Sequence, residues 1–478
     1  MTETSTVRPP DLATPPAARN PLRWFVLAVV LAGNILDLMD ATIVNVAGPS
    51  IRHDLGGGAS SLLWLSAGYT LAFAVLLITG ARLGDMFGRR RLFLVGSAGF
   101  TVLSAACAVA PSPAVLIAFR VLQGSFGALM IPQGFGMLKE VFSQDEMSKV
   151  YGVFGPMLGL SALAAPILSG ALTEANLWGI GWRLVFLINV PIGIAAFAGA
   201  VRVLPRTVAH PGIRLDTVGM VLIGAALTAI IYPLIQGRAA GWPAWTFTTL
   251  AAGAVLLAAF VLWERRRHSD PLIEPGLLAN HTYTTGILVA LAFFGAFGGL
   301  LLCVSLFAQL GEHFSPIHAG LTLAPMVLGM IVGMGAGFAL VDRLGRHLLH
   351  LGVVFLAAGM VALALTVTGA RTASSLDLAP SLFLAGVGAG ASFGQLFDFI
   401  LAGVSMDEVG SATGVLEAIQ QLSNAIGVAA LGTIFFSAFG GHLPTHGLEI
   451  TAWACLVPLA ITFLLVFNLP MRVREKQA

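Results

Sequence analysis

The sequence predicts an all-α polytopic membrane protein, and three observations support this fold class. First, 57% of the 478 residues are hydrophobic and only 10% are charged, whereas soluble proteins carry about 25% charged residues. Second, apolar runs of about 20 residues recur from Leu22 onward, and a helix of that length crosses a bilayer. Third, these runs lack the period of two that strands of a membrane barrel show. A water-soluble protein would need polar faces on its outer helices, which these runs do not provide.

Fourteen transmembrane helices are expected, joined by mostly short connections that contain proline, glycine or charge. In chain order the predicted spans cover residues 23–49, 61–81, 91–110, 114–136, 150–172, 184–204, 215–236, 244–263, 283–310, 317–340, 348–369, 378–404, 409–438 and 450–469. The seventh and eighth spans are almost free of polar side chains, which suits a structural role facing lipid. The segment before the first span is polar and rich in proline, so we expect a disordered tail there.

Lysine and arginine set the predicted orientation, because they are retained in the cytoplasmic loops of membrane proteins. If the N-terminus is cytoplasmic, 20 of the 25 lysines and arginines fall on the cytoplasmic side, 4 fall outside and Arg120 lies within a span. An even number of helices then places both termini in the cytoplasm. We therefore expect a multi-pass protein of the cell membrane.

An internal repeat sets the predicted domain plan. The stretch Gly80-Ala-Arg-Leu-Gly-Asp85-Met-Phe-Gly88-Arg89-Arg90 returns, degraded, as Gly337-Phe-Ala-Leu-Val-Asp342-Arg343-Leu-Gly345-Arg346-His347. The two copies are 257 residues apart, which corresponds to eight helices rather than six. We therefore expect two pseudo-symmetric six-helix bundles with two helices inserted between them, a duplication typical of secondary transporters. The predicted parts are a cytoplasmic tail (1–21), the N-terminal bundle (22–205), the inserted helices (206–270), the C-terminal bundle (271–470) and a second cytoplasmic tail (471–478).

Five charged side chains lie well inside the predicted spans rather than at their ends, namely Asp37, Asp40, Arg120, Asp398 and Glu417. An ionised side chain at the bilayer centre costs about 2.5–3.5 kcal/mol on insertion scales. Such residues persist where they pair with one another or line a wet cavity. All five are therefore candidate site residues.

Asp37 and Asp40 are three residues apart and so lie on one face of a helix. Two close carboxylates disfavour double ionisation, so one of them binds a proton more readily. Arg120 keeps its charge and needs a partner, which either aspartate would supply if the first and fourth helices face each other. The alternatives are a permanent structural ion pair and an Asp40 that only bonds neighbouring helices.

Asp398 and Glu417 flank one predicted turn at similar depth, so both are expected to face a central cavity. Glu417 would bind a cationic substrate or carry a proton there; a neutral, hydrogen-bonded side chain is the alternative for each. Aromatic residues in the spans, among them Tyr69 and Phe297, are candidates for an apolar substrate surface, although most such residues face lipid or core.

Four stretches give the chain a resemblance to the fourteen-helix drug:proton antiporters of the major facilitator superfamily. The first span resembles that family's signature of an aspartate followed by Thr-Ile-Val-Asn-Val, and the loop after the second span resembles the superfamily's loop between helices two and three. The four stretches are Asp40–Pro49, Gly80–Arg91, Arg120–Gly127 and Trp182–Gly193.

Two stretches depart from the family pattern. The fifth-helix antiporter motif usually contains Gly-Pro-x-x-Gly-Gly, but this chain has Ala165-Pro166-Ile-Leu-Ser169-Gly170. In the thirteenth helix the family often has an asparagine followed by Arg-Gln, but this chain has Gly414-Val-Leu-Glu417-Ala-Ile-Gln420-Gln421, which lacks the basic residue and contains an acid.

The resemblance, together with the buried charges, implies three groups of functional residues. The proton-coupling residues would be Asp40, Asp37, Arg120 and Glu417. The substrate-binding residues would be Glu417, Asp398, Gln123, Tyr69 and Phe297. The gating residues would be Gly80, Asp85, Gly88, Arg89, Arg90, Asp342, Arg346 and Pro166, with the arginines bound to carboxylates of their own half. A basic loop that only fixes topology is the alternative for the gating group.

An ion gradient is the expected energy source, because the sequence has no phosphate-binding loop of the Gly-x-x-x-x-Gly-Lys-Ser/Thr type. One charge crossing 100 mV supplies about 2.3 kcal/mol. We expect a monomer in the lipid bilayer whose partners are protons and a cationic or neutral amphipathic small molecule. We expect no cofactor, no nucleic acid partner and no enzymatic activity. We also expect no metal site, because Cys107, Cys303 and Cys455 lie singly in apolar runs and no pair has the spacing of metal ligands.

The sequence therefore favours a secondary active transporter that exports small amphipathic drugs or antibiotics in exchange for protons by alternating access. One alternative is a transporter of a single metabolite or of a self-made antibiotic. The altered fifth-helix motif favours this alternative, because it departs from the motif of the antiporters. A second is a non-transporting membrane sensor, for which buried charges would have little use.

Overall fold

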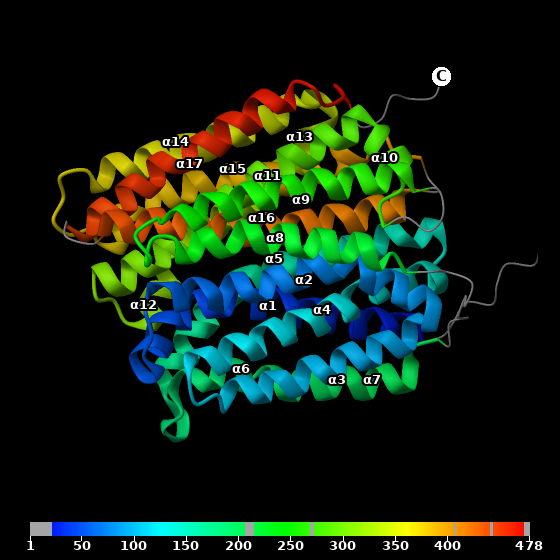
Figure 1. Cartoon of the computed structure of the whole chain (residues 1–478), viewed down its shortest axis with the longest axis horizontal. Helices are drawn as coiled ribbons and strands as arrows, with labels where there is room; N and C mark the ends of the chain where they lie inside the picture. Colours follow the sequence, from blue (N-terminus) through cyan, green and yellow to red (C-terminus); the bar gives the residue numbers. More distant parts are fainter. Residues whose placement is uncertain (1–21, 206–214, 268–271, 406–407, 440–442, 473–478) are drawn as a thin grey trace, which may run out of the picture.

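The computed structural model describes residues 22–205, 215–267, 272–405, 408–439 and 443–472. The predicted N-terminal tail and residues 473–478 lie outside these ranges. Every regular element in the described residues is helical (Figure 1). The first seven α-helices are α1 (Arg23–Leu55), α2 (Ala59–Phe87), α3 (Arg89–Ala108), α4 (Pro113–Val141), α5 (Gln144–Ala175), α6 (Leu184–Leu187) and α7 (Asn189–Val203). The remaining helices are α8 (Thr217–Gln236), α9 (Ala244–Arg266), α10 (Pro275–Ala279), α11 (His281–Leu306), α12 (Pro316–Thr322), α13 (Ala324–Leu344), α14 (His347–Val367), α15 (Ser375–Leu401), α16 (Val409–Phe439) and α17 (Pro444–Val466).

Thirteen helical stretches of the described chain are long and apolar enough to cross a membrane. The helix α5, with 32 residues, is long enough to be a fourteenth. The predicted all-helical membrane fold is therefore confirmed. We call α1–α7 the N-terminal half and α10–α17 the C-terminal half.

Glycine explains the two turns of the sequence repeat. Gly88 separates α2 from α3 with φ 94°, and Gly345 follows α13 with φ 54°. Residues with a side chain rarely adopt this region of backbone space. Each glycine thus allows one long helix to end and the next to begin after only one or two residues. This requirement explains why the glycine recurs at the same position in both copies of the repeat.

Two predicted spans are each divided into two helices in the structure. The span 184–204 forms α6 and α7, with Ile188 between them. The sequence predicts a single helix over 317–340, but α12 ends at Thr322 and α13 begins at Ala324. Pro325 lies in the first turn of α13, where its missing N–H is tolerated, whereas deeper in a helix it would break a hydrogen bond. The break between α12 and α13 therefore places Pro325 in the first turn of a helix, where a proline is tolerated.

The two halves repeat the same pairs of packed helices. In the N-terminal half α4 packs against α2 and α3, while α1 packs against α5 and α7. In the C-terminal half α15 packs in the same way against α13 and α14, while α11 packs against α16 and α17. Figure 1 shows the C-terminal half along the top and the N-terminal half along the bottom, except that α12 lies beside the N-terminal half.

Close backbone contact holds α13 against α15. A methyl group at Gly333 would overlap the carbonyl oxygen of Val387, and one at Gly386 would overlap that of Met326. Small residues of this kind let membrane helices approach each other closely and gain van der Waals contact. This contact matters because lipid tails are as apolar as the side chains, so the hydrophobic effect does not drive helices together in a membrane.

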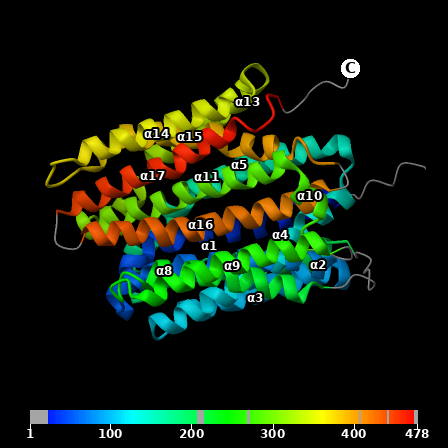
Figure 2. The same cartoon turned by 45° about the horizontal axis from the view of Figure 1, so that its top comes forward.

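The helices α8 and α9 pack against each other, and α8 contacts one helix of each half, α2 and α16 (Figure 2). Val255, Leu262 and Trp263 of α9 are all more than a third exposed. This exposed apolar surface suits contact with lipid.

Asp216 fixes the start of this helix pair. Its Oδ1 accepts the Gly219 N–H at 3.0 Å, its Oδ2 accepts the Trp263 Nε1–H at 2.9 Å, and Arg267 Nη1 lies 3.2 Å from Oδ1. Burial of the carboxyl opposes ionisation, but these donors outweigh it and hold the pKa of Asp216 below its ordinary value.

The ends of the bundle differ in charge and in contacts between the halves. The α2–α3 and α13–α14 turns and the end of α9 lie at one end, which we call the arginine-rich end; the opposite one is the far end. Toward the far end, Ser305 Oγ donates to the Asn45 carbonyl at 2.9 Å, and Gln309 Nε2 donates to the Val46 carbonyl at 2.8 Å. The Ile317 N–H also donates to Glu174 there, at 3.3 Å. These hydrogen bonds join the two halves at the far end.

Candidate functional site

A buried ion pair joins α1 to α4 in the middle of the N-terminal half. Arg120 Nη1 donates to Asp40 Oδ2, and both side chains are fully buried. Arg120 Nη2 also donates to the Asp40 carbonyl at 3.2 Å, and Nε donates to the Leu65 carbonyl at 3.2 Å. The guanidinium therefore binds α1 and α2 at once.

Three neutral side chains complete this cluster. Asn189 Nδ2 donates to Asp40 Oδ1 at 2.7 Å. Gln123 Oε1 accepts from Arg120 Nη1 at 2.8 Å, and Gln123 Nε2 donates to Ser104 Oγ at 2.7 Å. We call Asp40, Arg120, Gln123, Ser104 and Asn189 the buried cluster. Its members come from α1, α3, α4 and α7, so it ties four helices together.

Asp37 lies beside the buried cluster but has a different partner. The Tyr69 hydroxyl donates to Asp37 Oδ1. The ring of Tyr69 also lies 4.2 Å from the Arg120 guanidinium carbon, a cation–π contact. Tyr69 thus contacts Arg120, the partner of Asp40, and donates a hydrogen bond to Asp37.

Removing one partner of this ion pair leaves an uncompensated buried charge, which costs about 3–5 kcal/mol. Adding a proton to Asp40 would have a related effect, because Arg120 would lose its counter-ion while keeping its charge. The arrangement therefore makes the packing of α1 against α4 and α7 sensitive to protonation of one carboxyl group.

The two acids of the C-terminal half lie in different surroundings. Glu417 is partly buried on α16 and close enough to Asp37 for their charges to interact. Asp398 is exposed in the last turns of α15. The structure thus brings Glu417, but not Asp398, toward the acids of α1.

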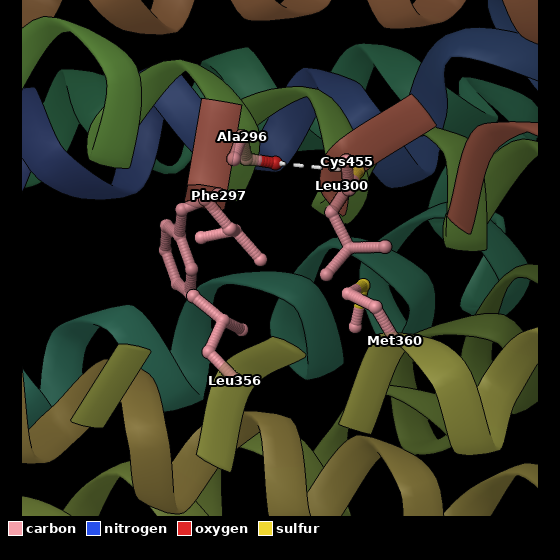
Figure 3. A pocket seen from close by; sticks show the side chains of 7 residues that line it. Ala296, Phe297, Leu300, Leu356, Met360 and Cys455 are labelled. Atoms are coloured by element: carbon pink, nitrogen blue, oxygen red, sulfur yellow. Dashed lines mark hydrogen bonds between the residues drawn. The ribbon is translucent and has the colours of Figure 1, made fainter. Parts of the chain in front are cut away.

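Of the predicted substrate-binding residues, Gln123 and Tyr69 are fully buried in or beside the buried cluster. Phe297 instead points into an apolar crevice within the C-terminal half (Figure 3). The crevice lies between α11, α14 and α17 and has no room for a water molecule. It is lined by Ala296, Phe297, Leu300, Leu356, Met360, Cys455 and Leu459. The structure therefore does not bring these predicted residues to one surface.

An ion-pair network fills the first copy of the repeat. Arg89 Nη2 lies 3.0 Å from Asp85 Oδ1, and Arg89 Nη1 lies 3.5 Å from Glu140 Oε1. A methyl group at Gly136 would overlap the Arg89 guanidinium, so the glycine makes room for it. The network connects α2, α3 and α4 within the N-terminal half.

The other arginines of the repeat bind the ends of helices. Arg90 Nη2 donates to the Val201 carbonyl in the last turn of α7. In the second copy, Arg346 Nη1 donates to the carbonyls of Phe467 and Leu469, at 2.7 and 2.9 Å, just after α17. A cation is favoured at a helix C-terminus. Asp342 is exposed.

A glutamine packed on a glycine of each repeat copy was not predicted from the sequence. Gln133 Nε2 donates to the Gly80 carbonyl at 2.7 Å, and its amide also fills the space beside Gly84. In the C-terminal half, the amide of Gln395 fills the space beside Gly337, the repeat counterpart of Gly80. Both glutamines interrupt apolar helices, and that was the available signal.

Pro166 belongs to the junction of the halves at the far end. A methyl group at Gly320 of α12 would overlap the Pro166 carbonyl, and one at Gly170 would overlap that of Pro316. The chain keeps these small residues even though it lacks the usual pair of glycines in the fifth helix. They allow α5 and α12 to touch along their backbones.

With this geometry in hand, comparison with known proteins identifies the family. The family model of the Major Facilitator Superfamily matches residues 30–214 and 208–428. The chain belongs to the major facilitator superfamily. The resemblance found in the sequence is therefore confirmed.

Curated relatives within the superfamily carry the names of antibiotic and drug exporters. A "Probable actinorhodin transporter" of Streptomyces coelicolor is 48% identical over 433 residues, 90% of this chain and 74% of the relative. A "Tetracenomycin C resistance and export protein" of Streptomyces glaucescens is 33% identical, covering 91% of this chain and 80% of the relative. A "Multidrug efflux pump" of Mycolicibacterium smegmatis is 32% identical, covering 90% and 84%.

Solved structures of other transporters share the fold. An auto-inhibited peptide transporter of the POT family superposes with a TM-score of 0.70 at 13% identity, covering 95% of this chain and 99% of that chain. An inward-facing bacterial homologue of the transporter Spinster gives a TM-score of 0.66 at 15% identity, covering 96% and 99%. At these identities the likeness concerns the fold alone.

Proposed function

We propose that this chain exports small amphipathic compounds, cationic or neutral, in exchange for protons by alternating access. The observation that carries the proposal is the ion pair between Asp40 and Arg120, fully buried in a chain of membrane-spanning helices. A buried pair of this kind gains little stability over apolar packing, so its presence favours a role in coupling. The names of the relatives support export of antibiotics and drugs.

In the proposed cycle, a proton from outside neutralises Asp40 and frees Arg120 from its counter-ion. The loss of that contact loosens α1 from α4 and favours reopening toward the cytoplasm. Substrate binding then favours release of the proton inward. Glu417 and Asp37, whose charges interact, would take part in substrate recognition or in carrying the proton.

The proposed orientation places the arginine-rich end and both termini in the cytoplasm of a cell-membrane protein. The distribution of lysine and arginine supports it. The hydrogen bonds of Ser305 and Gln309 to α1 then lie on the outer side, which supports a state closed toward the outside.

The proposed domain plan keeps the two six-helix bundles, 22–205 and 271–470, the inserted helices 206–270 and the two tails. The matching helix pairs of the two halves support it. In this plan the Asp85–Arg89–Glu140 network and the Arg90 and Arg346 contacts hold each bundle together at the cytoplasmic side while the bundles rock. We propose that the monomer is the working unit.

Everted membrane vesicles energised by respiration test the proposal. Addition of a transported compound is expected to dissipate part of the pH gradient, and Asp40→Asn is expected to abolish that response while the protein remains folded. A panel of aromatic antibiotics and lipophilic cations without any response from folded wild-type protein would refute coupled export.

A narrower function is the second candidate. Two of the relatives are named after a single antibiotic, actinorhodin or tetracenomycin C. If export is narrow, deletion of the gene would sensitise the cells to one compound only. Sensitisation to several unrelated compounds would favour broad export instead.

A further inference from the structure

Asn189 is the member of the buried cluster whose hydrogen bonding is incomplete. Its Nδ2 donates to Asp40 Oδ1 at 2.7 Å and lies 3.4 Å from Ser104 Oγ. Its Oδ1 is buried and accepts no hydrogen bond from the residues that the structure describes. The whole residue is 1% exposed. A buried acceptor without a donor destabilises a fold, so this oxygen requires an explanation.

We propose that Asn189 is a positioning residue that serves Asp40 in both of its protonation states. The amide NH₂ donates to the ionised carboxylate, as the structure shows, and the amide oxygen accepts the O–H of the protonated acid. The inference rests on the proposed function, in which Asp40 takes up a proton from hydronium on the open side, leaving water, and later returns the proton to water on the other side.

An asparagine amide is suited to this exchange. Its side chain has two N–H donors on the nitrogen and an acceptor on the oxygen, and the distribution of its χ2 torsion is broad and roughly two-fold. A half-turn about χ2 therefore places Oδ1 where Nδ2 had been, without a new backbone conformation. Protonated Asp40 then keeps a hydrogen bond to α7 at the moment when it loses Arg120.

The other groups around Asp40 are already engaged. Arg120 has only donors, and the Asp40 carbonyl and Gln123 Oε1 both accept from it. The Tyr69 hydroxyl is bound to Asp37, and the charge of Glu417 of α16 interacts with that of Asp37.

Among the remaining neighbours of the buried cluster, the Cys107 Sγ of α3 lies 3.7 Å from Gln123 Oε1. No ionisable group of α5, α6, α7, α11 or α12 bonds to Asp40 in the part of the chain that the structure describes. The Asn189 oxygen is thus the buried acceptor of the cluster, among the described residues, that remains available to an acid O–H.

Infrared difference spectroscopy of the reconstituted full chain tests the inference directly. Spectra at acid and neutral pH are subtracted; Asp40→Asn identifies the Asp40 carboxyl band, and Asn189→Leu identifies the Asn189 carbonyl band. We expect the Asn189 carbonyl to move to lower frequency when Asp40 gains its proton, because an unbonded carbonyl becomes hydrogen-bonded. An Asn189 band that is identical at both pH values overturns the inference.

Transport provides the second measurement. Asn189→Leu is expected to slow proton-driven exchange about tenfold at both ends of the pH range, because each protonation state loses a hydrogen bond. Asn34→Leu is the matched control, since Asn34 is a buried asparagine of α1 whose Nδ2 donates to the Val30 carbonyl at 2.9 Å. It should leave both the Asn189 band and its pH response unchanged. A loss confined to one end of the pH range would mean that Asn189 serves only one state, contrary to the inference.

Different results would refute the proposed function and the inference about Asn189. If Asp40→Asn retains proton-coupled exchange, the proposed function fails. If Asp40 titrates and couples while the Asn189 carbonyl stays unchanged, only the inference fails. Should Asn189→Leu not fold, Asn189→Thr assigns the band, and carbon-13 labelling of asparagine in the wild-type chain reports its shift.

Discussion

At the scale of single residues, the ion pair between Asp40 and Arg120 makes a prediction about stability. Arg120→Met leaves Asp40 buried without a counter-ion, so the free energy of unfolding should fall by about 3–5 kcal/mol. Asp40→Asn combined with Arg120→Met removes both charges and should recover much of that loss. Thermal unfolding of the detergent-solubilised proteins measures both effects. A double variant no more stable than Arg120→Met would contradict the assignment.

Tyr69 makes the second residue-level prediction. Tyr69→Phe keeps the ring against Arg120 but removes the hydroxyl bound to Asp37, so Asp37 loses a donor to its ionised form. The pH at which exchange is half-maximal should therefore move upward. Tyr283→Phe is the matched control, because the buried Tyr283 hydroxyl donates to the Ala412 carbonyl, at 2.8 Å, away from the acids. Equal effects of both variants on the pH profile would refute a specific role for Tyr69.

Sequence reasoning identified the charged members of the buried cluster, and Gln123 as a candidate for substrate binding, but it did not identify Asn189 or Ser104. A charged side chain in an apolar run is rare because its burial is costly, so Asp40 and Arg120 stand out in the sequence. Asn189 and Ser104 do not, because neutral polar residues are common in membrane helices. Their partners depend on how α3 and α7 are rotated against α1, which no local pattern encodes. The spacing of Asp37 and Asp40 likewise did not reveal that each has a different partner.

At the scale of helices, the glycines between α13 and α15 predict a packing effect. Gly333→Ala should destabilise the protein by about 1–3 kcal/mol, because its methyl group would overlap the Val387 backbone. Gly335→Ala on the same helix is the control, since a methyl group there has no neighbour within 4 Å. Thermal unfolding compares the two variants. Similar losses in both would mean that helix propensity, not the contact with α15, governs the effect.

The inserted helix pair makes a prediction about pH. Because hydrogen bonds and Arg267 hold the pKa of Asp216 below its ordinary value, ionised Asp216 stabilises the fold above the unfolded-state pKa of about 3.9. That stabilisation should disappear as the pH falls through the lower, folded-state pKa. The difference in unfolding temperature between wild type and Asp216→Asn should therefore be largest near pH 6 and shrink in acid. A difference that is constant from pH 6 to pH 3 would rule out this linkage.

Helix existence was predictable from hydropathy, whereas the exact positions of helix breaks were not. The apolar runs that predict the spans also continue through Leu323, so nothing in hydropathy separates α12 from α13. The break depends on Pro325 and on the contact of α12 with α5 of the other half. A contact between segments so distant in the chain lies beyond any pattern within one span.

At the scale of the whole molecule, the proposed orientation predicts which residues can be labelled from outside an intact cell. Trp178 and Leu376 are more than four-fifths exposed at the far end, and Phe87 is about half exposed at the arginine-rich end. Single cysteines at Trp178 and Leu376 should react with a membrane-impermeant maleimide in intact cells, while a cysteine at Phe87 should react only after permeabilisation. The native cysteines Cys107, Cys303 and Cys455 are buried, so the unmodified chain provides the background. The reverse pattern would place the contacts of Ser305 and Gln309 with α1 on the cytoplasmic side, and the same structure would then represent a state closed toward the cytoplasm.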